Sequence, residues 1–432
     1  MPRKPPLKSA LVRTGARHRR EPPVTVAIGA AALEALSRPP VPRKPRKPKP
    51  ENAIAPSSFR PHVRADERIL FWSAPFIDSS RQSASKVLPE EITRLLFNVI
   101  IHSIEPGTRK NYGAGLLRYH QFCNRFRIPE ASRMPASELV LAAFVSAWVG
   151  QVGSSTVDNW LAGLRFWHTA HAAPWHGDRL LKAACTTIGK LQPPPKPKRP
   201  PVTLEHMHAL RSGLDLTNAF DAAVFALACS AFWGCRRRLG ELLLQGPNEF
   251  DPARHVARQA GVRFNKIRGS GESYAVFHVP WTKSTKTLGA DVVLVSNSDP
   301  SSPVPAMQHH LRSNASIPDH APLFSFETSN GSWAPMTRAW FLERCNRVWK
   351  DAELEALTGH CFRIGGATEL LLRGTHPDMV ATLGSWKSRA FLEYWRKIES
   401  ILPLFISSSF GQSRAQLASD TMRDFRKKHR LK

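Results

Sequence analysis

The sequence predicts a mostly helical protein with two folded domains, the second of which also contains a small antiparallel sheet. Apolar residues recur at i, i+3, i+4 and i+7 in four segments between about Ser85 and Leu191, as on the buried faces of helices. A proline-rich basic stretch interrupts this pattern at Pro193–Thr203. Beyond it, short alternating apolar runs lie between further helical segments, which is typical of a mixed domain. With 432 residues, the chain is long enough for two such cores.

Residues 1 to about 80 are predicted to be a disordered basic tail. They are rich in Pro, Lys and Arg, most of all in PPVPRKPRKPKP at Pro39–Pro50, and this composition buries too little apolar surface to offset the entropy of ordering. The basic runs fit nuclear-import signals or non-specific DNA contacts. The apolar run VTVAIGAAALEAL at Val24–Leu36 is shorter than the roughly 20 residues that span a bilayer, and it contains a glutamate.

Residues 85–192 are predicted to form a compact helical domain. Its periodic segments are LPEEITRLLFNVIIHSI, TRKNYGAGLLRYHQFCNRF, ASELVLAAFVSAWVGQV and STVDNWLAGLRFWHTAHA. Ser154 or Ser155 is a candidate N-cap for the fourth segment. Basic and amide side chains on the polar faces are candidates for phosphate contacts, and a solvated helix face is the equally open alternative. These candidates are Arg109, Lys110, Asn111, Arg118, Asn159 and Arg165.

A linker, PPPKPKRPPVT, separates the two domains at 193–203. Its proline density favours an extended, semi-rigid path, and its three basic side chains suit a course along DNA. Thr203 is a candidate N-cap for the second domain, which covers 204–432. The basic residues of the linker are Lys196, Lys198 and Arg199.

The second domain is expected to be α+β. It begins with three helical patterns, TLEHMHALRSGL, NAFDAAVFALACSAFWG and RRLGELLLQG. Three strand-like runs follow, HVARQAGVRFNKIR, SYAVFHVPWTKSTK and GADVVLVSN, and the polar turns between them predict a small antiparallel sheet. Helical patterns return from about Pro305 to the end of the sequence.

The charge of the chain predicts a polyanion as its partner. The 61 Lys and Arg residues against 34 Asp and Glu give a formal net charge of +27. The first 50 residues, with 13 Lys or Arg and 2 Glu, carry 11 of these charges, so the folded part is basic as well. Each phosphate neutralised releases counterions, which makes nucleic-acid binding strong and salt-dependent. The six cysteines are scattered without a C-x-x-C pair, which predicts reduced thiols and no structural zinc.

Two stretches of the second domain contain cationic side chains that are candidates for contacts with a phosphate or a leaving group. In GCRRRLGELLL, Arg238 precedes Glu241 by three residues, so both lie on one face of a helix; a surface ion pair is the ordinary alternative. The segment PWTKSTKTLGA holds Lys283 and Lys286 in a turn, from which a flexible ammonium reaches a phosphate or a leaving oxygen. Hairpin tips also carry lysine for solubility, so neither stretch decides the function alone.

Two further stretches lie closer to the C-terminus. In GHCFRIGGATELLLRG, His360 and Arg363 are three residues apart at an expected helix start, where the helix dipole favours an anion. Tyr394 follows Arg363 by 31 residues, within LGSWKSRAFLEYWRK. A packed aromatic beside Phe391 and Trp395 is the ordinary alternative for this tyrosine. The order of the four stretches along the chain is more informative than any one of them.

Arg, a hairpin Lys, His-x-x-Arg and Tyr, in that order, form the active-site pattern of the tyrosine recombinases and phage-type integrases, which the second domain resembles. RLGELLL resembles the family's first-arginine segment, HCFRIGGATELLLRG its His-x-x-Arg helix, and LGSWKSRAFLEYWR the segment that reaches the nucleophile. TRKNYGAGLLRYHQFC and STVDNWLAGLRFWH resemble the DNA-facing helices of its core-binding domain. The resemblance covers roughly Ser85–Phe405, and its wording looks closer to eukaryotic, transposon-like members than to bacterial ones.

This resemblance implies a helical, SAM-like core-binding domain followed by a DNA breaking-rejoining catalytic domain. One position departs from the family pattern. Many members place His or Trp nine residues before the tyrosine, where this chain has Ser385. Trp386 is one residue later, and an indole there can donate a hydrogen bond or pack against the tyrosine segment. The role is therefore expected for Trp386, with Ser385 as the alternative.

The resemblance also implies a reaction, in which the phenol of Tyr394 attacks a DNA phosphodiester. The product is a 3′-phosphotyrosyl link and a free 5′ hydroxyl, formed without ATP, metal or another cofactor. Because a free phenol has a pKa of about 10, the site must favour loss of its proton and stabilise the phosphoryl charge. The other implied roles are a phosphate clamp by Arg238 and Arg363, proton transfer by His360, general acid catalysis by Lys283 with Lys286 as the alternative, and orientation of Arg238 by Glu241.

The expected partner is double-stranded DNA, bound by a homo-tetramer on paired sites, with no membrane involved and in the nucleus if the chain is eukaryotic. Three rival interpretations stay open. A type IB topoisomerase-like relaxer shares the same chemistry on one duplex. A catalytically decayed DNA-binding protein derived from a mobile element is suggested by the departure at Ser385, although the other site residues are intact. A basic chromatin or RNA-binding protein accounts for the charge alone.

Overall fold

The structure is a computed structural model, which describes residues 40–43, 45–195, 197–234 and 239–386 and a few single positions outside these ranges. Those positions are Leu36, Ile401, Pro403, Asp420, Arg423, Asp424 and Lys427. Three of the residues singled out in the sequence therefore lie outside the described residues, namely Lys196, Arg238 and Tyr394.

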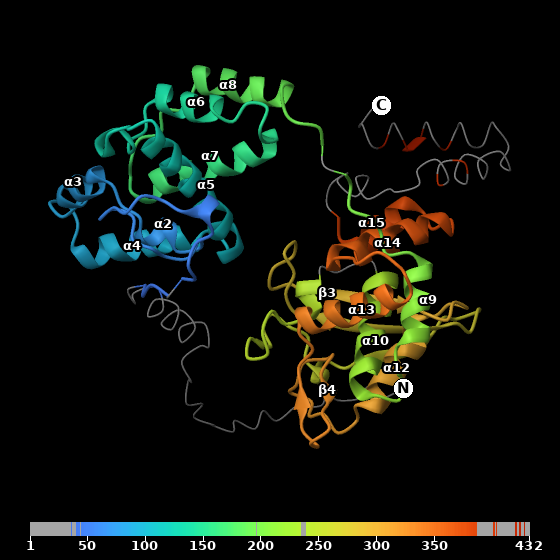
Figure 1. Ribbon diagram of the computed structural model, residues 1–432. Helices are drawn as coiled ribbons and strands as arrows, with labels where there is room; N and C mark the ends of the chain where they lie inside the picture. The colour runs from blue at the N-terminus through green and yellow to red at the C-terminus, as the bar shows by residue number, and fades with distance from the viewer. Residues whose placement is uncertain are drawn as a thin grey trace, which may run out of the picture. The chain divides into compact units, whose positions relative to one another are not determined.

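Two compact units make up the chain, Met1–Lys196 and Pro197–Lys432, and each is described by itself (Figure 1). In the residues that the structure describes, the first unit is helical, whereas the second combines helices with two small antiparallel sheets. The mostly α fold class with a small antiparallel sheet, which the sequence predicts, is confirmed. None of the described helices is long and apolar enough to cross a membrane.

In the first unit, helices α5 and α7 pack most closely together. A Cβ atom added to Gly115 of α5 would lie 2.6 Å from the Cα of Trp160, and one added to Gly163 of α7 would lie 2.8 Å from the Cα of Tyr112. The two glycines therefore allow direct backbone contact between these helices. The elements of the unit are η1 (Pro50–Asn52), α2 (Arg68–Phe71), α3 (Pro75–Ala84), α4 (Glu90–His102), α5 (Pro106–Arg125), η2 (Glu130–Ser132), α6 (Glu138–Ser146), α7 (Ser154–Ala170) and α8 (Arg179–Lys190).

The start of α7 differs from the prediction that Ser154 or Ser155 is its N-cap. Gly153 occupies the N-cap position, and Ser154 is the first helical residue. The backbone N–H of Ser154 donates to Oε1 of Gln192 at 3.4 Å. The prediction was wrong because the amide of a residue distant in sequence accepts from the first turn, so this turn has a partner other than a local hydroxyl.

The folded part of the first unit begins earlier than the sequence predicts. Where the sequence suggests a disordered tail as far as about residue 80, Val63, Ile69, Trp72 and Ile77 are at most 6% exposed and belong to the same core as α5 and α7. The high content of Pro, Lys and Arg over the first 80 residues conceals this short apolar run, because composition is an average over the whole segment.

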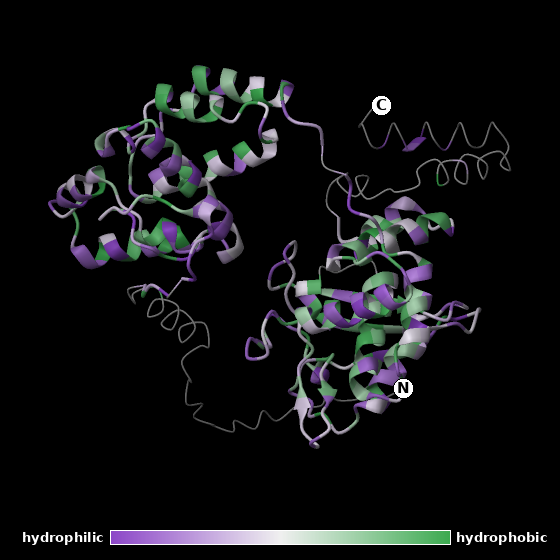
Figure 2. Cartoon of the chain, in the orientation of Figure 1, coloured by the Kyte–Doolittle hydropathy of each residue, from purple (hydrophilic) through white to green (hydrophobic). Residues whose placement is uncertain are grey.

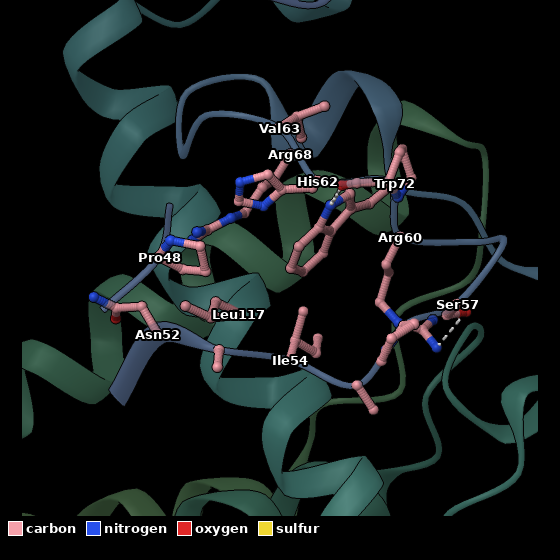
Figure 3. A pocket seen from close by; sticks show the side chains of 14 residues that line it. Pro48, Asn52, Ile54, Ser57, Arg60, His62, Val63, Arg68, Trp72 and Leu117 are labelled. Atoms are coloured by element: carbon pink, nitrogen blue, oxygen red, sulfur yellow. Dashed lines mark hydrogen bonds between the residues drawn. The ribbon is translucent and has the colours of Figure 1, made fainter. Parts of the chain in front are cut away.

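The chain before α2 lies against α5 and lines a pocket of about 400 Å³ (Figure 3). Pro48 and Asn52 line it from this segment, and Leu117 lines it from α5. Arg60 is buried in its wall, and its guanidinium donates to Ser57 Oγ at 2.9 Å and also pairs with the carboxylate of Glu130. The charge of Arg60 is therefore used inside the unit, where it ties this segment to the chain after α5.

Helix α10 forms the centre of the second unit. Its residues from Asp221 to Trp233 are all buried, and Figure 2 shows the helix mainly in the hydrophobic colour. Helices α12 and α14 pack against it, as expected for a helix that is apolar on every side. The elements of the unit are α9 (Leu204–Gly213), α10 (Ala219–Trp233), α11 (Leu239–Leu242), η3 (Arg258–Ala260), β1 (Arg263–Lys266), β2 (Ser273–Val279), β3 (Ala290–Val295), α12 (Pro303–Ser313), β4 (Phe326–Glu327), β5 (Trp333–Ala334), α13 (Arg338–Asp351), α14 (Gly359–Leu372) and α15 (Pro377–Gly384).

The larger sheet has the strand order β1–β2–β3, with both pairs antiparallel. Ala275 pairs with Leu294, and Phe277 pairs with Val292; all four side chains are at most 1% exposed. This period-two burial turns one face of the sheet toward the core of the unit. The hairpin between β2 and β3 carries the two lysines of PWTKSTK.

The end of the linker is fixed to α14 within the second unit. The N–H of Val202 donates to the carbonyl of Cys361 at 3.0 Å. A Cβ at Gly365 would lie 1.9 Å from the carbonyl oxygen of Val202, so only glycine fits this approach. Thr203 caps α9 as predicted, because its Oγ1 accepts from the N–H of His206. The linker thus ends on the helix that carries the His-x-x-Arg pair.

Candidate active site

His360 and Arg363 lie in the first turns of α14, as their spacing predicts. Arg363 is 5% exposed. Its Nη2 donates to the carbonyl of Gly384 at 2.8 Å, and its Cζ lies 4.0 Å from the ring centroid of Trp386. One edge of the guanidinium is thus fixed by a carbonyl and one face by an indole, so this cation has a defined orientation.

The turn after α15 brings Trp386 onto Arg363. Ser385 adopts a left-handed conformation with φ 50° and ψ 42°. The N–H of Ser385 donates to Thr382, and the N–H of Trp386 donates to Ala381, each at 3.0 Å. The helix therefore ends in a tight turn, and the side chain that follows it reaches α14, with which α15 is in contact (Figure 1).

Gly384 is necessary for this arrangement, and the sequence reasoning missed it. A Cβ at Gly384 would lie 1.6 Å from the ring of Trp386. The sequence signal that could have identified Gly384 is the motif Gly-Ser-Trp, in which glycine precedes the tryptophan by two positions. Between the two candidates for the position before the tyrosine, Trp386 contacts Arg363, whereas Ser385 forms the turn.

The segment after Arg238 packs against the start of α14. Arg238 itself lies outside the described residues, and α11 begins at the next residue, Leu239. A Cβ at Gly359 would lie 2.4 Å from Cδ1 of Leu239. The residue that follows Arg238 in the chain therefore lies against the residue that precedes His360. This second glycine contact was not predicted either.

Glu241 connects α11 to the β2–β3 hairpin. Its carboxylate is buried, with the residue 6% exposed, and Oε1 accepts from the backbone N–H of Lys283 at 3.3 Å. This bond connects Glu241 to the lysine loop, and its orienting role toward Arg238 stays a prediction. A buried carboxylate requires such partners, because burial without them is costly.

The loop of the hairpin is closed by its own hydrogen bonds. Thr282 and Lys286 exchange backbone hydrogen bonds of 3.2 and 2.8 Å, and Oγ1 of Thr282 accepts from the N–H of Thr285 at 3.0 Å. Lys283 is exposed at this loop. The Nζ of Lys286 lies 5.5 Å from the centroid of Trp281, over which Arg254 also lies at 5.2 Å. Lys286 is thus directed to an aromatic ring.

Tyr394 lies outside the described residues, but described residues lie on both sides of it. Trp386 precedes it, and Ile401 follows it. Ile401 is fully buried with Leu371 of α14 and Val380 of α15, and Trp386 packs against the same cluster. Trp386 and Ile401, the described residues on either side of 387–400, therefore both pack against α14 and α15.

The predicted DNA-binding residues of the first unit differ in their surroundings. Lys110, Asn159 and Arg165 are exposed, and Arg109 is half-buried. The Nδ2 of Asn159 donates to the carbonyl of Ser155, on its own helix, at 2.9 Å. In the linker, Lys198 and Arg199 are exposed.

Arg118 has partners inside the unit, and its role as a phosphate contact stays a prediction. Its Nη1 donates to the carbonyl of Glu51 at 2.7 Å and to Oε1 of Gln121 at 2.8 Å, and its Nη2 donates to Oδ1 of Asn52 at 3.2 Å. These contacts form because the turn at Pro50–Asn52, assigned to the tail from its composition, lies over this part of α5.

Arg68 is a buried cation that the sequence reasoning did not select. Its Nη1 donates to the carbonyl of Gly113 at 2.9 Å, and its Cζ lies 5.3 Å from the ring of Trp72. Burial, with a smaller contribution from Arg118, lowers the pKa of Arg68 to about 10. The contacts of Arg68 are thus within the unit, and they attach α2 to α5.

No protein-family profile matches the chain, and no curated protein sequence matches it. Among solved structures, the chain is similar to the XerH site-specific recombinase bound to its difH substrate, with a TM-score of 0.46 and 14% identity over 82% of this chain and 99% of that one. It is also similar to the Tn1549 transposon integrase in complex with circular-intermediate DNA, with a TM-score of 0.39 and 17% identity. This match covers 71% of this chain and 96% of that one. A third is a lambda integrase dimer bound to a core site, with a TM-score of 0.37 and 13% identity over 75% and 97%. The structural neighbours are therefore site-specific recombinases and integrases, at TM-scores below 0.5.

Proposed function

We propose that the chain is a site-specific DNA recombinase or integrase that cleaves and rejoins strands through a phosphotyrosyl intermediate on Tyr394. The observation that carries the proposal is the fixed orientation of Arg363, between the carbonyl of Gly384 and the indole of Trp386, beside the segment that leads to Tyr394. The packing of Leu239 on Gly359 and the bond from Lys283 to Glu241 support it, because they connect the other two stretches to the same part of the unit.

In the proposed reaction, the phenol oxygen of Tyr394 attacks the phosphorus of a DNA phosphodiester. A bond from phosphorus to the phenol oxygen forms, and the bond from phosphorus to the 5′ oxygen breaks. His360 accepts the phenol proton, and the ammonium of Lys283 gives a proton to the departing 5′ oxygen. A 3′-phosphotyrosyl link and a free 5′ hydroxyl result.

The two arginines of the pattern, Arg238 and Arg363, bind the non-bridging oxygens as negative charge develops there. A guanidinium suits this task because two of its donors lie in one plane. Removal of one donor from such a preorganised site typically costs about 3–4 kcal/mol of transition-state stabilisation. The indole of Trp386 holds Arg363 in orientation, so that the cation does not have to be ordered during the reaction.

The reaction as proposed requires neither ATP nor a metal ion, because the energy of the broken phosphodiester is retained in the phosphotyrosyl link. A second 5′ hydroxyl then reseals the strand. Recombination joins two duplexes through four cleavages, which fits a homo-tetramer on paired DNA sites. The basic runs before residue 50 fit import into a nucleus, and the wording of the four stretches fits a transposon-like member of the tyrosine recombinases.

A nicked suicide duplex tests the proposal directly. Cleavage near the nick releases a short oligonucleotide that diffuses away, so the covalent adduct accumulates and is resolved on a denaturing gel. The wild-type chain is expected to form the adduct, and Tyr394→Phe is expected to form none. Tyr274→Phe, on β2, is the matched control and should form it normally. An adduct that persists in Tyr394→Phe would overturn the assignment of the nucleophile.

The same preparation separates recombination from relaxation. A supercoiled plasmid with two copies of the target site should yield crossover products that depend on Tyr394. Relaxation without any crossover product would instead favour a type IB topoisomerase-like enzyme, which uses similar chemistry on one duplex.

A further inference from the structure

Helix α4 of the first unit carries an exposed apolar stripe. Ile92, Leu96 and Val99 are spaced i, i+4 and i+7, so they lie on one face of the helix. Their exposed fractions are 47, 51 and 48%. Leu88, just before the helix, is 39% exposed as well. We call Ile92, Leu96 and Val99 the α4 stripe.

The opposite side of α4 already packs into the core of the unit. Ile101 is fully buried there, and Phe97 packs against the same core. A surface helix of a soluble protein normally has one apolar face and one polar face. Because α4 is apolar on two faces, the α4 stripe has the character of a surface that another segment covers.

The structure also indicates which segment reaches α4. Asn98 is 4% exposed, and its Nδ2 donates to the carbonyl of Leu36 at 2.5 Å. Leu36 is the last residue of the apolar run Val24–Leu36, and it is the residue of that run that the structure describes. Leu36, the end of the run, therefore lies at α4.

We propose that Val24–Leu36 docks on the α4 stripe and completes the first unit as an additional layer. Apart from Thr25 and Glu34, the run contains only apolar residues and glycine, and five of its thirteen residues are alanine, which allows close approach. Both the run and α4 have 13 residues, so as helices each would be about 20 Å long. The proposal does not depend on the function proposed above.

Docking of this run has a consequence for charge. Residues 1–23 carry seven Lys or Arg and one Glu, and they immediately precede the run. Anchored at Val24–Leu36, these cations remain next to the helical unit, where they raise its local positive charge. If Val24–Leu36 did not dock, this run would instead be part of the linker between these cations and α4. The run thus links a basic segment to the unit that is proposed to bind DNA.

Hydrogen exchange of the full chain, read by mass spectrometry on peptides that cover 24–36, tests the proposal. Leu96→Glu places a carboxylate in the α4 stripe, and Arg94→Glu places the same residue two positions away on the same helix. We expect the amides of this run to exchange at least about tenfold more slowly in the wild type than in the isolated peptide. Leu96→Glu should abolish this protection, and Arg94→Glu should retain it. Thermal melting confirms that both variants are folded.

Two results would overturn the proposal. The first is exchange of 24–36 at the rate of the isolated peptide in the wild type, or protection that Leu96→Glu leaves unchanged. The second is protection that rises with protein concentration, together with cross-links between isotopically labelled and unlabelled chains at Leu96→Cys. That result would assign the α4 stripe to a second copy of the chain.

Discussion

Among single residues, Lys283 and Lys286 show how two similar side chains in one loop receive different surroundings. The N–H of Lys283 is held by the buried carboxylate of Glu241. Lys286 has a positive φ of 54°, and its ammonium lies over the ring of Trp281. At an exposed site such as this one, a cation over an indole is stabilised by about 0.5–1 kcal/mol, which Lys286 would lose on moving to a leaving oxygen. These surroundings favour Lys283 as the general acid of the proposed reaction.

We therefore predict that Lys283→Ala slows adduct formation on the nicked duplex by about 100-fold or more, and that Lys286→Ala slows it by only a few-fold. The measurement is a single-turnover time course. A duplex with sulfur in place of the scissile 5′ oxygen should restore the rate of Lys283→Ala, because a thiolate leaves without a proton. If Lys286→Ala is the slower variant and responds to the sulfur substrate, the general acid is Lys286.

The placement of His360 and Arg363 on one helix could be predicted from the sequence, but the contacts of Arg363 could not. His360 and Arg363 stand at a short, fixed spacing that places both at the start of one helix. The contact between Trp386 and Arg363 depends on the left-handed turn at Ser385 and on the missing Cβ of Gly384, and neither is visible as a pattern of chemistry. The positions of Arg238 and Tyr394 around the phosphate remain predictions.

Among the elements, the crossing of α5 and α7 is sensitive to a small change in volume. Gly115→Ala would place a Cβ within 2.6 Å of the backbone of Trp160, and backbone cannot rotate away as a side chain can. We expect a loss of about 1–3 kcal/mol in the free energy of unfolding. Gly107→Ala, in the first turn of α5 with no atom within 4 Å, is the control.

Urea titration of the full chain, followed by tryptophan fluorescence, measures both variants. Gly107→Ala should be neutral or slightly stabilising, because alanine favours helix over glycine by up to about 1 kcal/mol. Gly115→Ala gains the same propensity, so any net loss is due to the helix crossing. Equal stability of the two variants would mean that the helices separate without cost.

The elements were predictable where periodicity is strong and unbroken. The alternation in SYAVFHV predicts β2, and the apolar run of NAFDAAVFALACSAFWG predicts α10. The chain from Val63 to Ile77 was missed because its helices are short and lie among prolines and arginines. Such elements are stabilised by tertiary burial rather than by their own propensity, and burial is not visible in a local average.

For the first unit as a whole, buried histidines make the free energy of unfolding depend on pH. In the core of the first unit, His168 is fully buried; its Nδ1 donates to the carbonyl of Leu164 at 2.8 Å, and its Nε2 accepts from the N–H of Ala136 at 3.0 Å. This pair of bonds requires the neutral ring, because a proton on Nε2 would remove the acceptor. Burial lowers the pKa of His168 to about 4 and that of His171 to about 3, and it holds the pKa of His120 well below its usual range.

Because these pKa values are lower in the folded state than in the unfolded state, the unfolded chain binds more protons as the pH falls below about 6.5. The stability is therefore complete above about pH 6.5 and decreases toward pH 4, by about 1.4 kcal/mol per pH unit for each such histidine, or roughly 3 kcal/mol for His168 alone.

Urea titrations from pH 7.5 to 4.5 measure this slope. His168→Gln should be less stable at pH 7.5 but should lose stability more gradually on acidification. A free energy of unfolding that stays constant between pH 7 and 5, or an unchanged slope in His168→Gln, would show that the first unit accommodates the protonated ring without opening.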